Sequence, residues 1–404
     1  MKFNGQNLVI AGLVPATHGA TTPQFDLAVT WVPATSAGMT MERKRRSRSP
    51  SKFNYILTCL FMLLSLPAEA GTSYEFKARG PETGQLRIEA SGDIEAIEPL
   101  IRDFQALEPT LAITYVDSLT NDLFGMMQEA CAKGATVADL VFSSSVDHMV
   151  KLANDGCAQP HTSPETTRAP PFASWHDEVF GFTFEPAVIV YNRNLVPPAD
   201  VPRSRDQLVD LLRNKAETYN NRIGTYDIAR SGIGYLFGFF DAQQSSAFGR
   251  MMEGFGRANA GLYCCTGELL RDIESGKILI GYNLLGSYAY GRYKAGAPIG
   301  IVLPRDYTLV LSRAAFVPAS AANPQAGKKF LDYLLSLRGQ QMAAEKSFFF
   351  AYGQTAPEGV DAAEPELQSG IYRPIPLGPA LLAVTDRHKK ARLLKEWNQS
   401  FQRR

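Results

Sequence analysis

Alternating and helical hydrophobic patterns follow one another repeatedly from about residue 85 onward. Residues 85–90 alternate apolar and polar side chains, as a half-buried strand does, and apolar residues at helical spacing follow over 94–104. The same order of strand, loop and helix returns over 113–127 and over 138–152. Successive units of this kind predict an α/β fold with a largely parallel sheet.

A long extended run separates this first group of units from a second one. Residues 180–192 are too many for one ordinary strand, and Pro186 among them has no N–H to donate to a sheet. We therefore expect two extended pieces joined near Glu185, where the chain crosses from one lobe to another. Further strands are predicted over 222–226 and 278–282.

The return to the first lobe needs a second crossing. Residues 298–304 are again extended and precede a helix predicted over 324–335, so we place the return there. Without its first 70 residues the chain has 334, more than one hydrophobic core usually holds, which favours two lobes. The predicted boundaries are 71–185 and 299–350 for lobe 1, and 186–298 and 351–404 for lobe 2.

Residues 41–70 have the three parts of an export signal. Basic residues cluster from Arg43 to Arg48, an apolar run covers 53–66, and Ala68-Glu69-Ala70 is typical of a cleavage site. The apolar run is too short to span a bilayer stably. We interpret 41–70 as a signal peptide and expect the protein to work in the periplasm.

Residues 1–40 precede this signal and show little periodicity. They contain two similar Pro-Ala-Thr segments, which is typical of low-complexity chain. We interpret them as a mis-assigned or disordered leader, with translation starting at Met39 or Met41. A genuine N-terminal extension is the alternative.

Charge and cysteine content narrow the class of protein. Without residues 1–70 the chain keeps 34 basic and 37 acidic side chains, a formal charge near −3, so nothing indicates a nucleic-acid partner. Four cysteines remain, in an oxidising compartment if the protein is exported. Cys131 and Cys157 are the preferred pair for one disulfide. A disulfide between the adjacent Cys264 and Cys265 would be strained, so we do not expect it. Their spacing matches no zinc pattern.

Five segments share one design, a strand that ends in small or hydroxylated residues where a helix begins. Such ends offer free backbone N–H groups, hydroxyl donors and the positive end of a helix dipole, which together can bind an anion. Any one of them is most simply a helix cap, but ligands of open α/β sheets gather at the carboxyl ends of strands. The five together predict a ligand cleft. The segments are 91–93, 143–145, 230–232, 266–267 and 286–288.

Arginine and tyrosine side chains add candidate chemistry. Arg230 stands just before a Ser-Gly turn, where its guanidinium could clamp a carboxylate or a phosphate. The alternative is a surface arginine that pairs with Asp227. Four tyrosines could donate phenol hydrogen bonds or, if ionised, hold a ferric ion, although packed aromatics are the simpler interpretation: Tyr191, Tyr226, Tyr288 and Tyr290.

An enzyme is not indicated. The chain has no Gly-x-Ser-x-Gly elbow, no His-Glu-x-x-His pair and no Walker A loop. Of its five histidines, His18 lies in the leader and His388 in the basic tail. The other three, His148, His161 and His176, have no obvious nucleophile beside them. A hydrolase with a Ser-Lys pair stays open, without support.

The segments in their order resemble a known family. The matching stretches include ASGDIEAIEPLIRDF, ADLVFSSSVDHMVKLANDG, FEPAVIVYNRNLV, TYDIARSGIGYLF and ESGKILIGYNLLGSYAYGRYKAG. From about Leu86 to about Leu337 the chain resembles the periplasmic solute-binding proteins of ABC importers, in the branch that binds ferric iron, 2-aminoethylphosphonate or phosphoglycerate-type solutes. The resemblance implies a type II periplasmic-binding fold, in which two α/β lobes joined by crossing strands enclose a ligand cleft.

The resemblance also implies a function and partners. We expect a monomer without a cofactor that captures a small-molecule ligand by closing the cleft and delivers it to an ABC permease in the inner membrane. A sensory subunit that presents its liganded form to a membrane receptor kinase is the alternative. The candidate ligand-binding residues are Ser91, Gly92, Asn121, Ser143, Ser144, Ser145, Tyr191, Arg230, Ser231, Gly232, Thr266, Ser287 and Tyr288.

The ligand class depends on one short stretch. Iron-binding members have two neighbouring tyrosines after a late strand, and the first aligns with Tyr288 here. Its neighbour is Ala289, so the pair is broken unless Tyr290 substitutes. Helix ends with Arg230 suit an organophosphonate, a phosphorylated acid or a carboxylate instead. We therefore favour a small anionic solute over a transported ferric ion held by Tyr288 and Tyr290.

Overall fold

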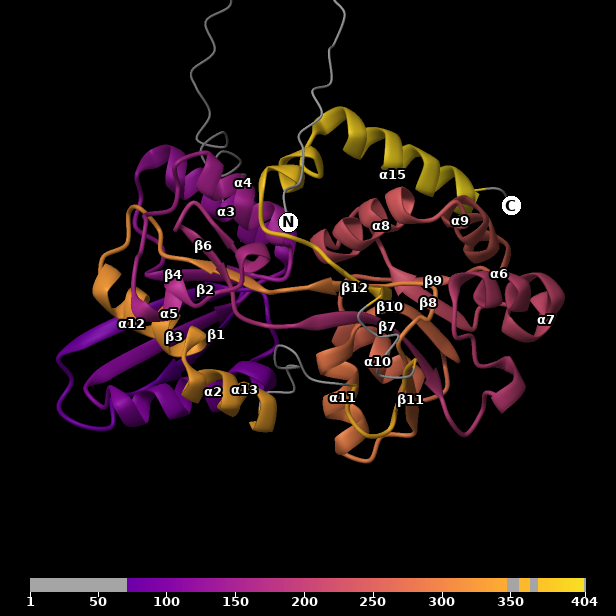
Figure 1. Cartoon of the computed structure of the whole chain (residues 1–404), viewed down its shortest axis with the longest axis horizontal. Coiled ribbons are helices and arrows are strands. Elements are labelled where there is room, and N and C mark those ends of the chain that lie inside the picture. Colours follow the sequence, from indigo (N-terminus) through magenta and orange to yellow (C-terminus); the bar gives the residue numbers. More distant parts are fainter. Residues whose placement is uncertain (1–70, 347–355, 364–369, 403–404) are drawn as a thin grey trace, which may run out of the picture. The chain divides into compact units, whose positions relative to one another are not determined.

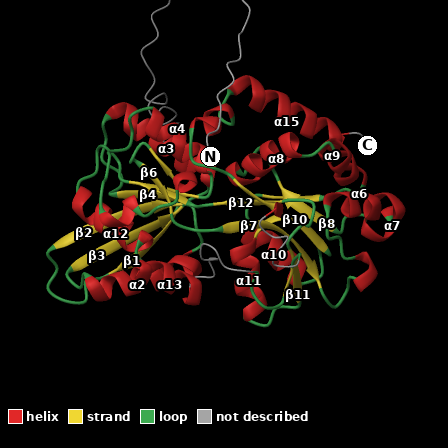
Figure 2. Ribbon diagram, in the orientation of Figure 1, coloured by secondary structure: helices red, strands yellow, loops and turns green. Residues whose placement is uncertain are grey.

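The computed structural model describes residues 71–346, 356–363 and 370–402, all of which belong to one compact unit. The predictions for residues 1–70, the leader and the export signal, lie outside the described residues. The described strands form a seven-stranded and an eight-stranded sheet, each covered by helices (Figure 1) (Figure 2). We call the first sheet with its helices lobe 1 and the second lobe 2.

Lobe 1 is built around β2 (Gly84–Ala90), which lies between two parallel neighbours, β3 and β4. Leu86 and Ile88 are fully buried while Gln85 and Arg87 face outward, which confirms the alternation in the sequence. The sheet order is β1-β3-β2-β4-β13-β6-β5. The other strands are β1 (Thr72–Phe76), β3 (Leu111–Asp117), β4 (Leu140–Ser143), β5 (Ser174–Trp175), β6 (Val179–Gly181) and β13 (Ala314–Phe316).

Amphipathic helices cover the sheet of lobe 1. In α2 (Ile94–Leu107) the apolar residues at helical spacing are buried, and Phe104 packs edge-on against Phe330 of α12, with 4.9 Å between ring centroids. This packing is the physical reason for the predicted period. The helices are α2, α3 (Thr120–Lys133), α4 (Val146–Asn154), α5 (Pro164–Thr167), η1 (Pro171–Ala173), α12 (Pro324–Leu335) and α13 (Leu337–Lys346).

Lobe 2 has β7 (Glu185–Asn192) at the centre of its sheet, antiparallel to β10, β11 and β12. Four successive apolar residues of β7, from Ala187 to Val190, are fully buried, as expected for a strand covered on both faces. The other strands are β8 (Ile223–Tyr226), β9 (Gly261–Tyr263), β10 (Ile280–Leu285), β11 (Ile299–Val302), β12 (Thr308–Leu311), β14 (Val360–Asp361) and β15 (Tyr372–Pro374). The helices are η2 (Pro198–Asp200), α6 (Arg205–Asn214), α7 (Ala216–Tyr219), α8 (Gly232–Gln244), α9 (Phe248–Arg257), α10 (Thr266–Glu274), α11 (Gly286–Lys294), η3 (Pro379–Ala383) and α15 (Arg387–Gln402).

Two extended pieces join the sheets, at 182–184 between β6 and β7 and at 312–313 between β12 and β13. They lie side by side, because the Phe182 N–H donates to the Arg313 carbonyl at 3.0 Å and the Arg313 N–H donates to Thr183 Oγ1 at 2.8 Å. The predicted return at 298–304 is wrong. Residues 299–302 form β11, which pairs with β7 inside lobe 2, so 299–311 do not belong to lobe 1.

The C-terminal segment contacts both lobes, whereas the sequence assigned 351–404 to lobe 2 alone. β15 pairs with β12, and α15 packs against α9, both in lobe 2. Between them η3 packs against α4 of lobe 1, and the Leu377 N–H donates to the Phe172 carbonyl at 2.7 Å. The reason is apolar burial, since Leu381 and Val384 of this segment are fully buried.

Two disulfides are present among the described residues. Cys131 at the end of α3 and Cys157 after α4 are bonded, as predicted. Cys264 and Cys265 are bonded as well, so the expectation that they stay unpaired is wrong. The chain bends at Cys264, between β9 and α10, and this irregular backbone brings two adjacent side chains together.

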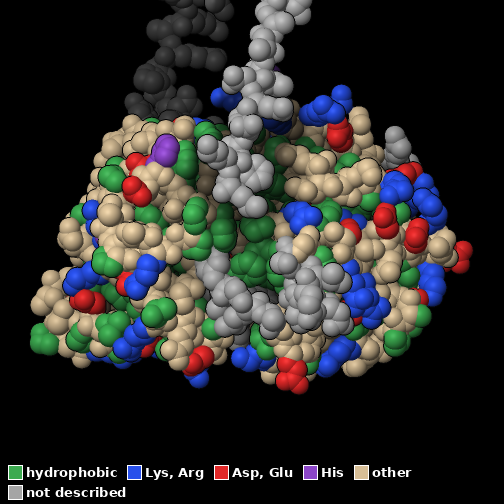
Figure 3. All heavy atoms as spheres, in the orientation of Figure 1, with side chains coloured by type: hydrophobic (Ala, Val, Ile, Leu, Met, Phe, Trp, Pro, Cys, Tyr) green, Lys and Arg blue, Asp and Glu red, His purple; other side chains and the backbone are tan. Residues whose placement is uncertain are grey.

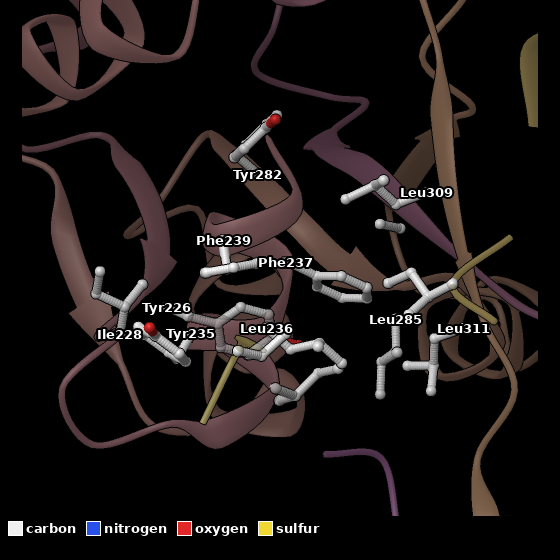
Figure 4. Close-up of a cluster of buried hydrophobic side chains, with 14 of the residues drawn as sticks. Tyr226, Ile228, Tyr235, Leu236, Phe237, Phe239, Tyr282, Leu285, Leu309 and Leu311 are labelled. Carbon is white, nitrogen blue, oxygen red and sulfur yellow. The ribbon is translucent and has the colours of Figure 1, made fainter. Parts of the chain in front are cut away.

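The largest hydrophobic core contains residues of both lobes. Figure 4 shows its part in lobe 2, where Phe237 and Leu285 lie near Leu309 and Leu311 of β12, and Tyr226 lies with Ile228 and Tyr235 on the other side of the cluster. The same cluster contains Val141 and Leu123 of lobe 1. Charged side chains of both signs lie over lobe 2 on the face shown in Figure 3. None of the described helices has the length and apolar character needed to cross a bilayer.

Candidate functional site

A cavity of about 340 Å³ lies between the two lobes. Its walls come mainly from the carboxyl ends of β2, β3 and β4 in lobe 1 and of β8, β9 and β10 in lobe 2, with the residues that follow them. This is the edge where ligands of α/β sheets gather. The residues that line it include Ser91, Gly92, Asp93, Asp117, Leu119, Asp122, Ser144, Arg230, Cys264, Cys265, Thr266, Leu285, Tyr288 and Arg313.

Six of the candidate residues predicted from the sequence line this cavity. The other seven ligand candidates, and Tyr290, are not among the lining residues. The six are Ser91, Gly92, Ser144, Arg230, Thr266 and Tyr288.

Several of the remaining candidates have structural roles instead. Ser143 Oγ lies 2.8 Å from Ser91 Oγ, and this hydrogen bond orients the Ser91 side chain. Ser231 Oγ caps α8 by accepting from the Gly234 N–H at 3.2 Å. Ser287 Oγ donates to Glu185 Oε2 at 2.6 Å. Tyr191, in β7, packs against Gly300, where an added Cβ would lie 2.2 Å from its ring. Ser143 therefore supports a cavity residue of lobe 1, and Ser231, Ser287 and Tyr191 have structural roles in lobe 2.

Asn121, Ser145 and Gly232 lie where the lobes touch. Asn121 Nδ2 donates to the Arg230 carbonyl at 2.8 Å, and the Gly232 N–H donates to Thr120 Oγ1 at 2.8 Å. A Cβ on Gly232 would lie 2.4 Å from Ser145 Oγ, so this close approach of α8 to lobe 1 requires glycine. The three candidates therefore lie at a contact between lobes rather than in the cavity wall.

Four helices begin at the cavity without a side-chain cap. The N-cap residues of α2, α3, α10 and α11 all line it, and none of their side chains accepts a hydrogen bond from the helix. The first N–H groups of a helix have no partner within that helix, so these ends provide donors and positive dipole ends around the cavity. The N-cap residues are Asp93, Leu119, Cys265 and Leu285.

Arg230 and Thr266 add side chains to the wall of lobe 2. Arg230 is exposed, and among the described residues no ion pair forms between its guanidinium and Asp227, whose Oδ1 accepts from the Ala229 N–H at 3.0 Å. Thr266 Oγ1 lies 2.5 Å from the Tyr226 hydroxyl, which orients it. The surface-pairing alternative for Arg230 is therefore not what the structure shows.

Arg313 lies on the cavity wall at the crossing between the lobes, and the sequence did not single it out. Its Nε is 3.1 Å from Glu185 Oε1, and both side chains are at most 1% exposed. It also donates to the Ser91 carbonyl and, at 3.4 Å, to the Tyr288 hydroxyl. The only sequence signal is its position between two extended runs, two residues after β12 and directly before β13.

Tyr288 connects the two lobes. Its hydroxyl accepts from the Asp93 N–H at 3.2 Å. Burial raises the pKa of this phenol above its ordinary value; the nearby Arg313 opposes the shift, and the carboxylates of Asp93 and Glu185 add to it. Tyr288 is therefore neutral at physiological pH and acts as a hydrogen-bonding group.

Carboxylates that the sequence did not list also line the cavity. Burial raises the pKa of Asp117 to about 7; a hydrogen bond from the Gly92 N–H at 3.0 Å lowers it, and the nearby Asp93 charge raises it. Burial also raises the pKa of Asp93, against the opposing charge of Arg313. A Cβ on Gly267 would lie 3.1 Å from Asp93 Oδ2, so this carboxylate reaches the start of α10.

The iron alternative depends on Tyr288 and Tyr290, and on which other side chains lie near them. The described residues contain no group of three or more His, Cys, Asp or Glu side chains arranged to hold a metal ion. Tyr288 and Tyr290 both lie on α11, where side chains two residues apart point about 200° away from each other. Tyr290 stacks on Tyr293 instead, with 6.1 Å between ring centroids.

Comparisons with known proteins agree with this architecture. Residues 90–341 match the family model described as bacterial extracellular solute-binding protein. The substrate-binding protein of an ABC transporter from Agrobacterium tumefaciens is 34% identical, with a TM-score of 0.77 over 83% of this chain and 100% of that one. Comparison with curated protein sequences gives no match.

More distant solved structures show the same fold. Iron-bound HitA from Pseudomonas aeruginosa is 17% identical, with a TM-score of 0.61 over 79% of this chain and 99% of that one. AfuA from Actinobacillus pleuropneumoniae, with fructose-6-phosphate bound, is 16% identical, with a TM-score of 0.61 over 80% of this chain and 100% of that one. At such identities the likeness concerns the fold alone.

Proposed function

The chain belongs to the bacterial extracellular solute-binding proteins, and we propose that it captures a small organic anion for an ABC importer by closing its two lobes around it. The family and the 34% identical relative support a substrate-binding subunit of an ABC transporter. Export to the periplasm, delivery to an inner-membrane permease and action as a monomer are parts of this proposal.

The fold that the sequence predicted is confirmed. Two α/β sheets joined by crossing strands, with a cavity between them, are the type II periplasmic-binding architecture of the structural neighbours. This architecture binds a solute between two lobes whose separation can change. It gives the cavity its function as a ligand cleft.

The observation that carries the anion proposal is the set of four uncapped helix ends. α2 and α3 begin in lobe 1, and α10 and α11 begin in lobe 2, so a bound anion can accept hydrogen bonds from both lobes. Arg230 adds a guanidinium on the same cavity, suited to two hydrogen bonds with a carboxylate or phosphate.

The carboxylates of the cleft indicate which kind of anion it can bind. Asp93, Asp117 and Asp122 line the cavity with only two arginines, and Glu185 already pairs with one of these, Arg313. A ligand with negative charge alone would be repelled by the ionised carboxylates. We therefore favour an organic anion that also carries hydroxyl or ammonium groups, which can donate to these carboxylates.

The two lobes already touch each other beside the cavity, through hydrogen bonds that involve no ligand. The hydrogen bonds from Gly232 to Thr120 and from Asn121 to Arg230 cross the interface beside the cavity. A solute that binds donors on both walls adds differential affinity for the closed form and shifts the open-closed equilibrium towards it. The permease would recognise this closed form.

Ferric ion is the competing ligand, because HitA and a Trichodesmium neighbour are iron-bound in their structures. The raised pKa of Tyr288 and the opposite direction of Tyr290 on α11 speak against a tyrosinate pair here. We therefore keep the organic anion as the proposed ligand.

A thermal-shift screen tests the proposal, since a ligand that binds only the folded state raises its melting temperature. The probes are 2-aminoethylphosphonate, 3-phosphoglycerate, citrate and ferric citrate, with sodium chloride at matched ionic strength as control. We expect at least one of the first three probes to raise the melting temperature of the wild-type protein. A shift with ferric citrate alone, together with a visible tyrosinate band, would contradict the proposal.

A further inference from the structure

The bonded pair Cys264–Cys265 is part of the cavity wall. Both residues line the cavity and both are partly exposed. They follow β9 and precede α10, with Cys265 as the N-cap residue of that helix. The disulfide therefore stands directly beside one of the four uncapped helix ends.

A role in global stability does not explain this pair. A disulfide stabilises mainly by limiting the unfolded chain, and the effect grows with the length of the loop that it closes. Cys131 and Cys157 are 26 residues apart, whereas Cys264 and Cys265 are neighbours. The adjacent pair can restrain only its own short segment, so its effect is expected at the cavity.

The chemistry of the pair differs from that of the wall around it. Ser91, Ser144, Thr266 and Arg230 offer hydrogen-bond donors, while a disulfide carries no hydrogen to donate. Divalent sulfur is polarisable and makes favourable contacts with carbon atoms. The two sulfurs thus give the cleft an apolar surface beside donors for an acid group.

We propose that the Cys264–Cys265 disulfide contacts the carbon skeleton of the bound solute and so selects organic anions over inorganic phosphate. This inference rests on the proposed function, an anion held at the helix ends. An organic anion whose acid group is bound by Arg230 and the other helix ends of the cavity can place its carbon atoms against the sulfurs. Inorganic phosphate has no carbon atom to make that contact.

Two double variants separate this role from stability. Cys264→Ser/Cys265→Ser removes the sulfurs from the cleft, and Cys131→Ser/Cys157→Ser is the matched control, with a disulfide that does not line the cavity. Calorimetry measures the affinity of each protein for 2-aminoethylphosphonate, 3-phosphoglycerate, citrate and inorganic phosphate. Melting temperatures show whether each variant is folded.

The expected result is a loss of affinity specific to organic probes. In Cys264→Ser/Cys265→Ser the organic probe that binds the wild type should bind about tenfold more weakly, the effect of about two methylene-sized contacts. Binding of inorganic phosphate should not change. The control should have a lower melting temperature and wild-type affinity for every probe.

Chemical reduction gives a second measurement that does not depend on the folding of the Cys264→Ser/Cys265→Ser variant. In the Cys131→Ser/Cys157→Ser background a dithiol such as dithiothreitol reduces Cys264–Cys265 to two thiols, giving up two electrons and two protons and becoming a cyclic disulfide. Alkylation and mass spectrometry follow the rate. A saturating organic probe should slow the reduction and bind more weakly to the reduced protein.

The outcomes distinguish the two proposals. If the wild type binds an organic probe and loss of the disulfide leaves its affinity unchanged, this inference is wrong and the proposed function stands. An equal loss of affinity for inorganic phosphate would also overturn it. A wild type that binds none of the organic probes contradicts the proposed function and, with it, the inference.

Discussion

Arg313 and Arg230 line the same cavity in opposite surroundings. Arg313, on the crossing between the lobes, is 1% exposed and bonded to Glu185, to the Ser91 carbonyl and to Tyr288. Arg230, before α8, is exposed and forms no ion pair with its neighbour Asp227. The guanidinium of Arg313 holds the two lobes together, whereas that of Arg230 can bind a solute. Identical side chains thus predict different consequences when they are removed.

The largest expected effect is on stability, at the crossing. Arg313→Met leaves Glu185 buried without its partner, which should lower the free energy of unfolding by about 3–5 kcal/mol. Urea denaturation measures it. The double variant Arg313→Met/Glu185→Gln should recover part of the loss, because no bare charge is left. A loss below about 1 kcal/mol in the single variant would show that the pair contributes little.

The second effect is on binding, in the cleft. Arg230→Ala should weaken the binding of an anionic probe by about 1.5–3 kcal/mol, the usual contribution of a hydrogen bond to a charged group, and leave the melting temperature nearly unchanged. Isothermal calorimetry measures the affinity. Arg213→Ala, at an exposed arginine of α6 outside the cavity, is the control and should bind as the wild type does. Unaltered affinity in Arg230→Ala would return Arg230 to a surface charge.

A third effect concerns pH, because Asp117 adds a charge that neither arginine neutralises fully. Its pKa is raised to about 7 in the folded protein, against an ordinary value near 4. Between these values the folded state binds more protons than the unfolded state, so this group makes stability fall as pH rises from about 4 to 7. Above pH 7 the ionised carboxylate also repels an anion.

Asp117→Asn should remove this pH dependence. We expect the affinity of the wild type for a monocarboxylate probe, which is fully ionised throughout this range, to fall about fivefold between pH 6 and 8. The variant should show a flat profile, because Asn keeps the acceptor for Gly92 and loses the charge. Asp122→Asn, at an exposed carboxylate of the same cavity, should keep the slope. Equal slopes in all three proteins would refute the role of Asp117.

The smallest effect is expected at Tyr288, which touches Arg313 and the opposite lobe. Tyr288→Phe removes a hydroxyl that accepts from the Asp93 N–H at 3.2 Å, so closure should lose about 0.5–1.5 kcal/mol. Calorimetry with the best organic probe would show a few-fold weaker binding. Ferric citrate should give no coloured complex with either protein. A stoichiometric coloured complex that Tyr288→Phe abolishes would make iron the ligand.

Features that depend on neighbouring residues were predictable from the sequence. The alternation over 85–90 and the helical period over 94–104 became β2 and α2 because a strand and an amphipathic helix bury one face each. The Cys131–Cys157 bond was predicted as well. Six candidate residues line the cavity because strand ends that open helices lie at one edge of each sheet.

Features that depend on distant partners were not predictable. The sequence predicts that residues 298–304 are extended, and it would do so in either lobe. Only the pairing of β11 with β7 assigns them to lobe 2. Arg313 and Asp117 are ordinary charged residues in the sequence. Arg313 has a structural role because it pairs with Glu185, which lies 128 positions away in the sequence. Burial raises the pKa of Asp117 to about 7.

The sequence by itself therefore determined the order of strands and helices, the α/β class and most strand ends that meet at the cleft, because these follow from the periods of 2 and 3.6 residues. The tertiary structure alone decided where the chain returns between lobes, which arginine is buried, and that Cys264 and Cys265 bond in the cavity wall. Burial and electrostatic pairing depend on residues that folding brings together, and the local sequence pattern does not show which residues those are.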